Sequence, residues 1–481
     1  MLKMISPLIF ILLFANPLRA AGLPRTDLNA IRAADISGTV KAPGAPRPAT
    51  ARRPKALTNW TVMYYSTTKD ALRYSLMWQL LEMKKTGSTD KVNVVVQAAV
   101  PVKHADGSIS TTTYRLALGK PGEPNHLDSM IEAMFKAGGA IDESVIAEFK
   151  DDIVWQQNST DTGDWHKVAD FTKWAKTNYP ARRYVFVIYG HGNGFFDQKK
   201  TPLEKGTLID VETKNYVTLP ELRLLMQATG RVDAFVMTSC IMQMGEVAWQ
   251  IKDYTDVIVG SSELMLSVGY DVGELLRTLN GSASVSSETL GEGIAASYVN
   301  LVKQLTKAGA HASVIRTGQL SAFGRKLDAW VDAEMALNDR TAIDKAIPLT
   351  ARFDIFGVTL ATSAAVASRV SMSGDLYDFV RLVLENTPKD TPAQQRVHET
   401  GQALMAFIAG GLIDKYYYTG VSNTGYDFSR AHGLSVHVPP VKIIGGSWDA
   451  FAKFLETDYW TLPFANETKW GAFLSWIYGR K

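Results

Sequence analysis

The sequence predicts an α/β protein in which a mostly parallel sheet is flanked by helices and followed by a mainly helical C-terminal region. Strand-like apolar runs alternate with amphipathic, helix-like segments over residues 58–275, and the run Tyr184–Tyr189 is apolar on both faces. Strands that are buried on both faces and separated by helices are typical of parallel sheets. We therefore expect a signal peptide at 1–20, a basic, proline-rich linker or pro-segment at 21–57, an α/β core at 58–275 and a mainly helical region at 276–481.

Each expected strand is rich in β-branched and aromatic residues, which favour extended backbone. In chain order the strands are Trp60–Tyr65, Val92–Val96, Tyr184–Tyr189, Val232–Thr238, Asp256–Gly260 and, late in the chain, Leu434–Val438. The expected helices have apolar residues three or four positions apart, which places these residues on one face. In chain order the helices contain Leu72, Leu76, Leu80 and Met83, then Val168, Phe171 and Trp174, and then Leu219–Met226. Gly87 and Pro180 are expected to end the first two helices, and Pro220 suits the first turn of the third.

The composition is that of an ordinary globular protein. Of the 481 residues, 46% are hydrophobic and 21% are charged, which excludes a mostly disordered, a collagenous and a many-span membrane protein. Residues 1–57 carry nine Lys and Arg against two Asp, a net charge of +7, so the overall charge of +3 leaves residues 58–481 at −4. A mildly acidic body gives no electrostatic reason to expect nucleic acid or an anionic membrane as a partner.

The first 20 residues have the features of a secretory signal peptide. Lys3 supplies a positive start, Ile5–Ala15 is an apolar stretch too short to span a bilayer comfortably, and Ala20-Ala21 places small residues at the cleavage point. The alternative is a membrane anchor that is not cleaved. We expect an exported mature protein, either periplasmic or secreted, that does not associate stably with a membrane once the signal peptide is removed.

The most informative pair of residues is His191 and Cys240, which is the only cysteine of the chain. A single cysteine excludes an internal disulfide, a thiolate zinc site and an iron–sulfur cluster. One predicted strand runs into Gly190-His191-Gly192, and the next ends just before Cys240. If these strands are neighbours, the imidazole and the thiol meet at one edge of the sheet and form the minimum pair for a cysteine nucleophile. The alternatives are a buried structural thiol and a structural histidine.

The backbone around these two residues adds to this interpretation. Glycines beside His191 let a substrate backbone approach closely, and the Gly192 N–H can point at a developing oxyanion. The Cys240 N–H precedes a helical stretch, whose dipole is expected to favour both the oxyanion and the thiolate.

Other motifs with known chemistry are missing from the sequence. The glycines at 190, 192 and 194 resemble a nucleotide loop, but Phe195 stands where the dinucleotide fingerprint needs a glycine. No Walker lysine, HExxH or GxSxG motif occurs. His432 and His437 are five residues apart on an expected strand, point to opposite faces and are expected to be structural. The sequence therefore predicts no cofactor and no metal site.

Several segments of the sequence resemble the clostripain family of cysteine peptidases, which belongs to the same clan as caspases, legumains and gingipains. Tyr184–Phe195 resembles the family's strand that ends in HG-x-G-aromatic, and Thr238–Gln250 resembles its D-A-C-x-M motif and the helix that follows, with Glu246 at the family's glutamate. Ser262-Glu263 and Gly269–Asp271 resemble its S-E-E and G-W-D segments. Two later segments, Asp375–Phe379 and Ala431–Ser435, also resemble the family. The resemblance spans roughly residues 58–460 and leaves out the leader.

This resemblance implies a caspase-like fold and the hydrolysis of polypeptide substrates. Carried over residue by residue, it makes Cys240 the nucleophile, His191 the general acid and base, and residues 58–275 the catalytic core. The backbone amides of Gly192 and Cys240 would form the oxyanion site.

The resemblance also implies cleavage after Arg or Lys, which the family recognises with acidic groups in its first specificity pocket. Asp271 matches one acidic position, whereas Thr238 stands in place of the family's Asp before the nucleophile. We expect Asp271, Thr238 and Ser262 to contribute to substrate binding. One carboxylate can still pair with a guanidinium or an ammonium group, but a pocket that contains Thr238 can also take a smaller or neutral side chain.

Several members of the family are inactive precursors that are cut in the loop between His and Cys. Here that loop contains Lys199, Lys200 and Lys205, and self-cleavage after one of them is one expectation; an uncut, solvated loop is the other. Calcium stimulates some relatives, but the sequence has no compact run of Asp that resembles a calcium loop.

Two other functions stay open at this point. The loss of an acidic residue at Thr238 is compatible with an inactive caspase-like binding module. The second is a cysteine enzyme whose main substrate is itself. The sequence leaves open the natural substrate, the oligomeric state and the role of residues 276–481.

Overall fold

The computed structural model describes residues 57–134, 139–195, 206–282, 284–306, 308–353, 372–422, 425, 427–439 and 459–478. The chain divides into two compact units, Met1–Lys55 and Ala56–Lys481, and every described residue belongs to the second. The expected signal peptide and all of the expected linker except Leu57 therefore lie outside the described residues. Within the described part, no helix is both long enough and apolar enough to cross a membrane.

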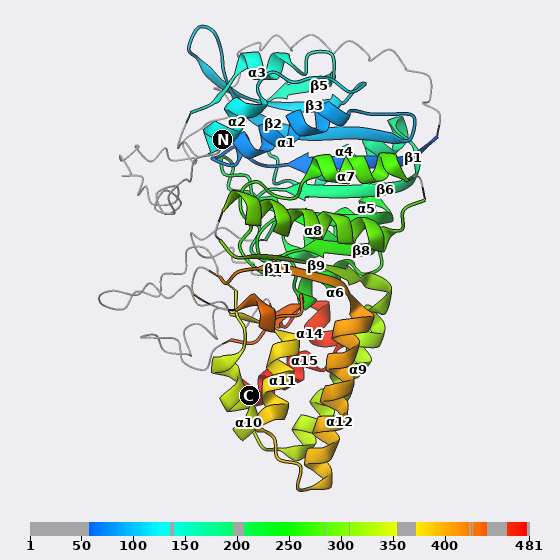
Figure 1. The fold of residues 1–481 in the computed structure, drawn as a ribbon, viewed down its shortest axis with the longest axis vertical. Helices are drawn as coiled ribbons and strands as arrows, with labels where there is room; N and C mark the ends of the chain where they lie inside the picture. Colours follow the sequence, from blue (N-terminus) through cyan, green and yellow to red (C-terminus); the bar gives the residue numbers. More distant parts are fainter. Residues whose placement is uncertain are drawn as a thin grey trace, which may run out of the picture. The chain divides into compact units, whose positions relative to one another are not determined.

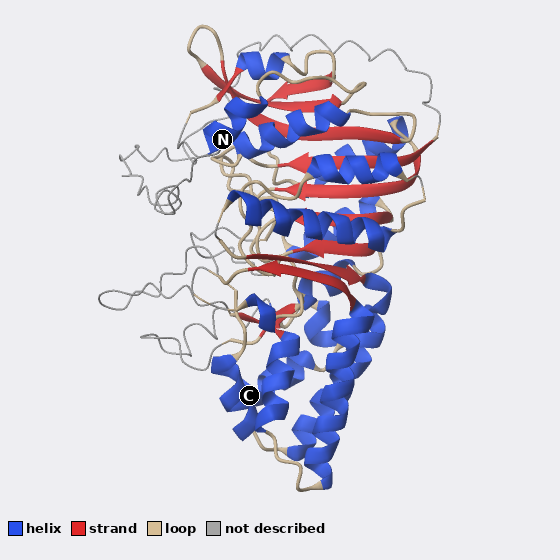
Figure 2. Ribbon diagram, viewed as in Figure 1, coloured by secondary structure: helices blue, strands red, loops and turns tan. Residues whose placement is uncertain are grey.

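A ten-stranded, mostly parallel sheet forms the centre of the second unit (Figure 1; Figure 2). Nine strands follow one another in the order β11-β9-β8-β7-β6-β1-β2-β3-β5, and β4 pairs with β2 outside this path. The five strands β1, β2, β6, β7 and β8 form a parallel group. Their bounds are Thr58–Ser66, Val92–Lys103, Ala181–Tyr189, Val232–Thr238 and Thr255–Gly260. The predicted α/β fold is thus confirmed, and each strand predicted before residue 275 is present.

Antiparallel strands extend the parallel group on both sides. β3 and β5 add to one side, and β9 and β11 add to the other. The bounds are Ile109–Ala117 for β3, Ile141–Asp142 for β4, Ile153–Asn158 for β5, Ala310–Arg316 for β9 and Ile413–Thr419 for β11. The expectation that the α/β core ends at residue 275 is therefore wrong, because two strands of the C-terminal region complete the same sheet.

Helices cover both faces of the sheet. On one face α1, α7 and α8 pack against residues such as Val62 and Tyr64, and Figure 1 shows these helices in front of the strands. On the other face α4, α5 and α6 pack against residues such as Met63 and Tyr65. The bounds are Arg73–Thr86 (α1), Trp165–Asn178 (α4), Leu219–Thr229 (α5), Gly245–Ile251 (α6), Val272–Gly281 (α7) and Ser287–Leu305 (α8). Successive residues of β1 thus alternate between two cores, which is why this strand is apolar on both faces.

Local sequence signals explain where these helices begin and end. Thr218 and Glu221 form a reciprocal capping box at the start of α5, with Pro220 in its first turn as predicted. Gly87 ends α1 with a φ of 58°, and a Cβ on this residue would lie 2.5 Å from the carbonyl oxygen of Gly119. Only glycine fits both conditions. Two short helices of the α/β part, α2 (Leu127–Met134) and α3 (Glu143–Ala147), carry no strong signal in the sequence.

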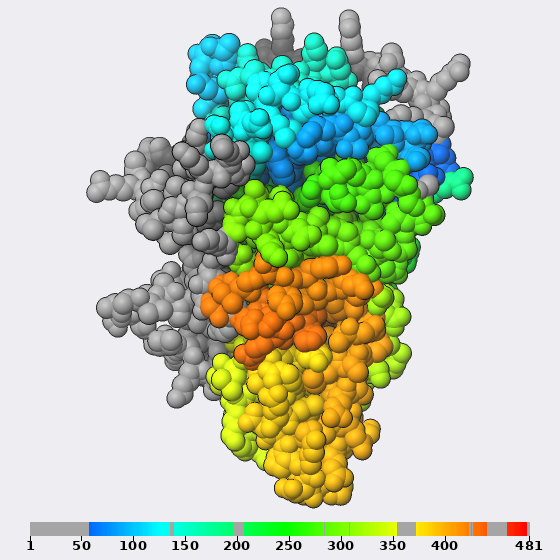
Figure 3. All heavy atoms as spheres, viewed as in Figure 1, coloured from blue at the N-terminus to red at the C-terminus, as the bar shows by residue number. Residues whose placement is uncertain are grey.

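The C-terminal region is mainly helical. It contains α9 (Leu320–Leu337), α10 (Thr341–Ala346), α11 (Leu376–Asn386), α12 (Pro392–Phe407), α14 (Pro463–Glu467), α15 (Trp470–Tyr478) and the short turns η4 (Thr317–Gln319), η5 (Ile347–Leu349), η6 (Ile408–Leu412) and η7 (Phe428–Arg430). The predicted late strand is β12 (Ser435–His437), which pairs with β10 (Ser373–Asp375) in a separate two-stranded sheet. In the space-filling view the orange surface of β11 adjoins the green surface of α8 (Figure 3), and α14 packs on α6, which joins the C-terminal region to the α/β core.

Candidate active site

The strands β6 and β7 bring the segments of His191 and Cys240 together. The two strands are parallel neighbours, their last residues Tyr189 and Thr238 lie opposite each other, and the Gly190 N–H donates to the Thr238 carbonyl at 3.2 Å. His191 and Cys240 each follow two residues after these strand ends. Both side chains therefore leave the sheet at the same edge, the carboxyl end of parallel strands, where reactive groups of such sheets gather.

Gly192 packs directly on the backbone of Cys240. A Cβ on Gly192 would lie 2.8 Å from the Cys240 carbonyl oxygen and 2.8 Å from the Ser239 Cβ. No side chain fits at this position, so steric contact with Cys240 and Ser239 requires a glycine at residue 192. The same packing holds the residues next to His191 against the backbone of Cys240.

His191 is held by a carboxylate that the sequence analysis did not single out. Its Nε2 lies 2.5 Å from the Asp70 Oδ2, and both side chains are partly exposed. Asp70 follows β1, which is the other neighbour of β6. Burial by itself raises the pKa of Asp70, but the hydrogen bond and the charge of His191, with the Leu72 N–H, bring this pKa below its ordinary value. Asp70 is therefore ionised at neutral pH.

The thiol of Cys240 is covered. The residue is 6% exposed, and its Sγ accepts a hydrogen bond from the Met265 N–H at 3.2 Å. Burial raises the pKa of the thiol to about 12, the nearby charge of Glu263 adds to this rise, and the Met265 amide opposes it. The expectation that a helix dipole favours the thiolate is wrong. The helix α6 begins only at Gly245, five residues after Cys240, and burial has the largest effect on the pKa of the thiol.

The cover consists of residues 261–270, which follow β8. The segment is fixed to the strand ends by bonds on both sides: the Ile241 N–H donates to the Glu263 carbonyl at 3.2 Å, and the Tyr189 hydroxyl donates to the Ser267 carbonyl at 2.6 Å. Further bonds join the Leu266 N–H to the Tyr298 hydroxyl at 3.0 Å and the Gln79 amide to the Val268 carbonyl at 2.6 Å. These bonds hold the segment in place beside the sulfur, which accepts from its Met265 N–H.

The three residues expected to bind substrate have other partners in this arrangement. Ser262 is fully buried, and its hydroxyl donates to the Gln243 carbonyl at 2.8 Å. Thr238 is buried beneath residue 269, where a Cβ would lie 2.5 Å from its methyl group. Asp271 caps α7, accepts from the Glu274 N–H at 2.9 Å, and lies 3.5 Å from the Arg277 guanidinium. Of the three, only Asp271 is partly exposed, and its pocket role stays a prediction.

Two carboxyl groups in the segments of the resemblance have structural roles. The Glu246 carboxylate accepts from the His437 N–H at 2.9 Å and from the Tyr459 hydroxyl at 3.0 Å, and burial raises its pKa to about 7. Asp375 caps α11 and accepts from the His432 N–H at 2.8 Å, and burial raises its pKa to about 7 as well. These two buried carboxyl groups tie the small sheet to α6 and α11.

The expected structural histidines pack on aromatic rings. His432 stacks on Tyr377, and His437 lies against Phe195 and Tyr459. Within the described residues, no group of three or more His, Cys, Asp or Glu could hold a metal ion. The lysines at 199, 200 and 205 lie outside the described residues.

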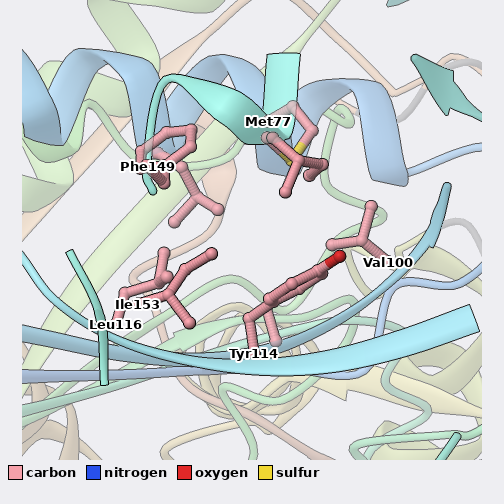
Figure 4. Close-up of a pocket in the computed structure, with 9 residues that line it drawn as sticks. Met77, Val100, Tyr114, Leu116, Phe149 and Ile153 are labelled. Atoms are coloured by element: carbon pink, nitrogen blue, oxygen red, sulfur yellow. The ribbon is translucent and has the colours of Figure 1, made fainter. Parts of the chain in front are cut away.

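An apolar pocket lies elsewhere in the molecule, between α1 and the strands β2 and β3 (Figure 4). Its lining includes Met77, Val100, Tyr114, Leu116, Phe149 and Ile153. None of its lining residues carries a thiol, an imidazole or a carboxylate.

Comparison with known proteins points to one family. A sequence profile of the clostripain family matches residues 81–397. Clostripain from Hathewaya histolytica is 24% identical over 254 residues, which are 48% of this chain and 44% of clostripain, so the match spans less than half the length of that relative.

Solved structures of low identity share the fold. A secreted C11 cysteine protease from Bacteroides thetaiotaomicron, in complex with an irreversible peptide inhibitor, is 15% identical with a TM-score of 0.52, covering 84% of this chain and 99% of its own. An inactive zymogen C11 protease from Parabacteroides distasonis is 14% identical with a TM-score of 0.52, covering 86% of this chain and 99% of its own. The mixed sheet with flanking helices is thus the caspase-like fold of these proteases.

Proposed function

The chain belongs to the clostripain family of cysteine peptidases, and we propose that it is an exported cysteine endopeptidase in which Cys240 is the nucleophile and His191 the general acid and base. The register of β6 and β7 carries this proposal, since it sends the imidazole and the thiol out of the sheet at one edge. The contact of Gly192 with the Cys240 backbone supports it further.

The proposed reaction proceeds through a thioester. His191 takes the thiol proton while Sγ bonds to the carbonyl carbon of the scissile peptide, and the amides of Gly192 and Cys240 stabilise the negative oxygen. The imidazolium then gives its proton to the leaving amine, and the C–N bond breaks. Water attacks the thioester, loses a proton to His191, and releases the acid as the thiol is restored.

The covered thiol suggests that this chain is a precursor. Because burial raises the pKa of the thiol to about 12, the thiol stays protonated at pH 7 in this arrangement. We infer that activation moves residues 261–270 and that self-cleavage after Lys199, Lys200 or Lys205 is the trigger. The Parabacteroides distasonis relative is itself described as an inactive zymogen, which supports this idea. Intact masses of wild type and Cys240→Ala test it, since two identical single chains would contradict self-cleavage.

We propose that the enzyme cuts after Arg or Lys with Asp271 as the acidic group of the pocket. The partly exposed carboxylate supports this, and the neutral Thr238 predicts weaker selection than two acidic residues give. Profiling with Arg, Lys, Ala and Asp before the cut tests the assignment in Asp271→Asn, which keeps the helix cap and removes the charge. Glu274→Gln is the matched control on the same helix. If Asp271→Asn keeps a basic preference, the pocket assignment is wrong.

Activity itself is tested with a fluorogenic peptide and with iodoacetamide labelling. We expect turnover and labelling of Cys240 in wild type, and loss of both in Cys240→Ala and His191→Ala. His166→Ala is the control, because this exposed histidine also pairs with a carboxylate, Asp164, at 2.9 Å.

An inactive binding module is the second candidate, and the burial of Cys240 together with Thr238 favours it. It predicts no turnover and no labelling that depends on His191, even after limited proteolysis between the two residues. A third outcome, cutting in cis without turnover of any library peptide, would favour an enzyme that acts mainly on itself.

We propose that the reaction needs no metal ion or organic cofactor, because a thiol and an imidazole supply the nucleophile and the proton transfer. Removal of calcium with EGTA tests the stimulation that the resemblance implies. Export is supported by the match to a secreted relative. N-terminal sequencing of the mature protein tests it, and a start near Ala21 is the expected result.

A further inference from the structure

We propose that Asp70 is a positioning residue of this site: its carboxylate holds the His191 ring with a proton on Nε2, and a buried ion pair of Lys69 fixes the loop that carries it. This inference rests on the proposed function, because a positioned imidazole matters only if it transfers protons. It adds a third strand end, that of β1, to the two that carry His191 and Cys240.

The loop that carries Asp70 is built onto the backbone of β6. Ser66 at the end of β1 lies opposite Tyr189, and the Thr67 N–H donates to the Tyr189 carbonyl at 3.2 Å. Asp70 then reaches His191, which follows two residues after Tyr189. The carboxylate therefore approaches the ring from a neighbouring strand, as the orienting group of a three-residue site must.

Both carboxylate oxygens of Asp70 are engaged. Its Oδ2 faces the His191 Nε2 at 2.5 Å, and its Oδ1 accepts from the Leu72 N–H at 3.0 Å. The backbone carbonyl of Asp70 accepts from the Arg73 guanidinium at 2.5 Å. The first two contacts orient the carboxylate and the third fixes the backbone, so the ring of His191 is aligned with Asp70.

The chemistry of the contact decides the tautomer. An ionised carboxylate can only accept hydrogen bonds, so the Nε2 facing Asp70 must carry the proton. The nitrogen that exchanges protons with the thiol and the leaving amine is then Nδ1. The same negative charge stabilises the imidazolium that forms when His191 takes the thiol proton. Asp70 does both without touching substrate.

The residue before Asp70 anchors the loop. The Lys69 ammonium is fully buried and contacts Asp210 Oδ2 at 2.8 Å, Glu212 Oε2 at 2.9 Å and the Thr160 carbonyl at 3.0 Å. Asp210 also accepts from the Thr162 N–H at 2.8 Å. A buried lysine with three oxygen partners cannot move without losing them, so the backbone at Asp70 is fixed from the other side.

The test compares kcat, KM and the pH–rate profile of wild type with Asp70→Asn and Asp70→Glu. Asn keeps an acceptor for the Leu72 N–H and removes the charge, so the loop is preserved. We expect kcat to fall about tenfold to one hundredfold with KM within about twofold. The limb of the profile that reports the imidazole should move about one unit to lower pH in Asp70→Asn and stay in place in Asp70→Glu.

Several charged groups lie near His191 and its partners. Asp70 faces the ring, Arg73 lies beside Asp70, and Glu263 lies near the thiol. Glu143→Gln removes the charge of another His–carboxylate pair, that of His104 at 3.2 Å, and should leave kcat and the profile unchanged. A wild-type kcat and profile in Asp70→Asn would overturn the proposal. An equal loss in Asn and Glu variants with an unshifted profile would also overturn it, since it would mark a purely structural role.

A measurement without turnover separates this inference from the proposed function. In the Cys240→Ala variant, ¹⁵N NMR of the eight histidines reports which ring nitrogen of each carries the proton. We expect a neutral His191 with its proton on Nε2, and a mixture of tautomers once Asp70→Asn is added. If His191 carries its proton on Nδ1, the proposal fails even for an active enzyme. If the tautomer is as expected but wild type neither turns over nor labels, the proposed function fails alone.

Discussion

The hydroxyl of Tyr298 holds the segment that covers Cys240, so its removal measures how the thiol becomes accessible. Tyr298 is buried in α8 and accepts from the Leu266 N–H at 3.0 Å, one residue beyond the amide that binds the sulfur. Tyr298→Phe deletes this one bond and keeps the ring. A net hydrogen bond contributes about 1 kcal/mol, which corresponds to an increase of about fivefold in the equilibrium constant for local opening.

The assay is the rate at which iodoacetamide labels Cys240 at neutral pH, with the thermal midpoint recorded for each variant. We expect labelling about fivefold faster in Tyr298→Phe. Tyr189→Phe removes the bond to the Ser267 carbonyl at 2.6 Å, and the two changes together should multiply to about 25-fold if they act on one opening event. Tyr65→Phe is the matched control, since its hydroxyl makes a similar bond to the Thr162 carbonyl at 3.0 Å outside the cover.

Two results would refute this reasoning. Unchanged labelling in Tyr298→Phe would mean that residues 261–270 are not the barrier in front of the sulfur. An equal acceleration in Tyr298→Phe and Tyr65→Phe would mean that the label enters through global unfolding. The second result would be accompanied by matching decreases of the thermal midpoint.

Three further outcomes follow from the same structure. Gly192→Ala should abolish measurable peptide hydrolysis, because its Cβ would lie 2.8 Å from the Cys240 carbonyl oxygen; a variant with wild-type kcat/KM would contradict the oxyanion site. Lys69→Met should lower the free energy of unfolding in urea by about 3–5 kcal/mol, since it leaves Asp210 buried without its ammonium partner; a loss below about 1 kcal/mol would show that water replaces the partner. Burial raises the pKa of Glu334 from 4.5 to about 8, so the folded state binds more protons than the unfolded state between these values, and stability should fall as the pH rises through that window. Glu334→Gln should flatten this part of the stability curve, and an unchanged slope would assign it to other groups.

The sequence is sufficient to predict the strands that precede His191 and Cys240. The runs that become β6 and β7 are apolar near their ends, and His191 and Cys240 each follow two residues after a strand end, so their placement at one edge follows from the rule for parallel sheets. The strands β9 and β11 could not be predicted in the same way. β9 begins with Ala, His, Ala and Ser and not with a continuous β-branched run, and β11 mixes charged and tyrosine residues in an antiparallel position at the end of the sheet.

The contact of Asp70 with His191 depends on strand order, which no local pattern encodes. β1 is the first strand in the chain, yet it lies between β2 and β6 in the sheet. Asp271 illustrates the opposite case, because a local sequence signal does predict its structural role. An Asp followed three residues later by Glu274 is a typical helix start, and Asp271 does cap α7.

Unfavourable features gather at three successive residues of this chain. The Ser239 hydroxyl is buried and has no hydrogen-bond partner within the described residues. Cys240 is a buried thiol with a raised pKa, and Ile241 has a φ of 61°, a left-handed conformation that a β-branched residue rarely adopts. Strain of this kind persists only where the surrounding structure enforces it, and here the Ile241 N–H bond to Glu263 does so. The same bond joins Ile241 to residues 261–270, so the left-handed residue next to Cys240 and the segment beside the thiol share one contact.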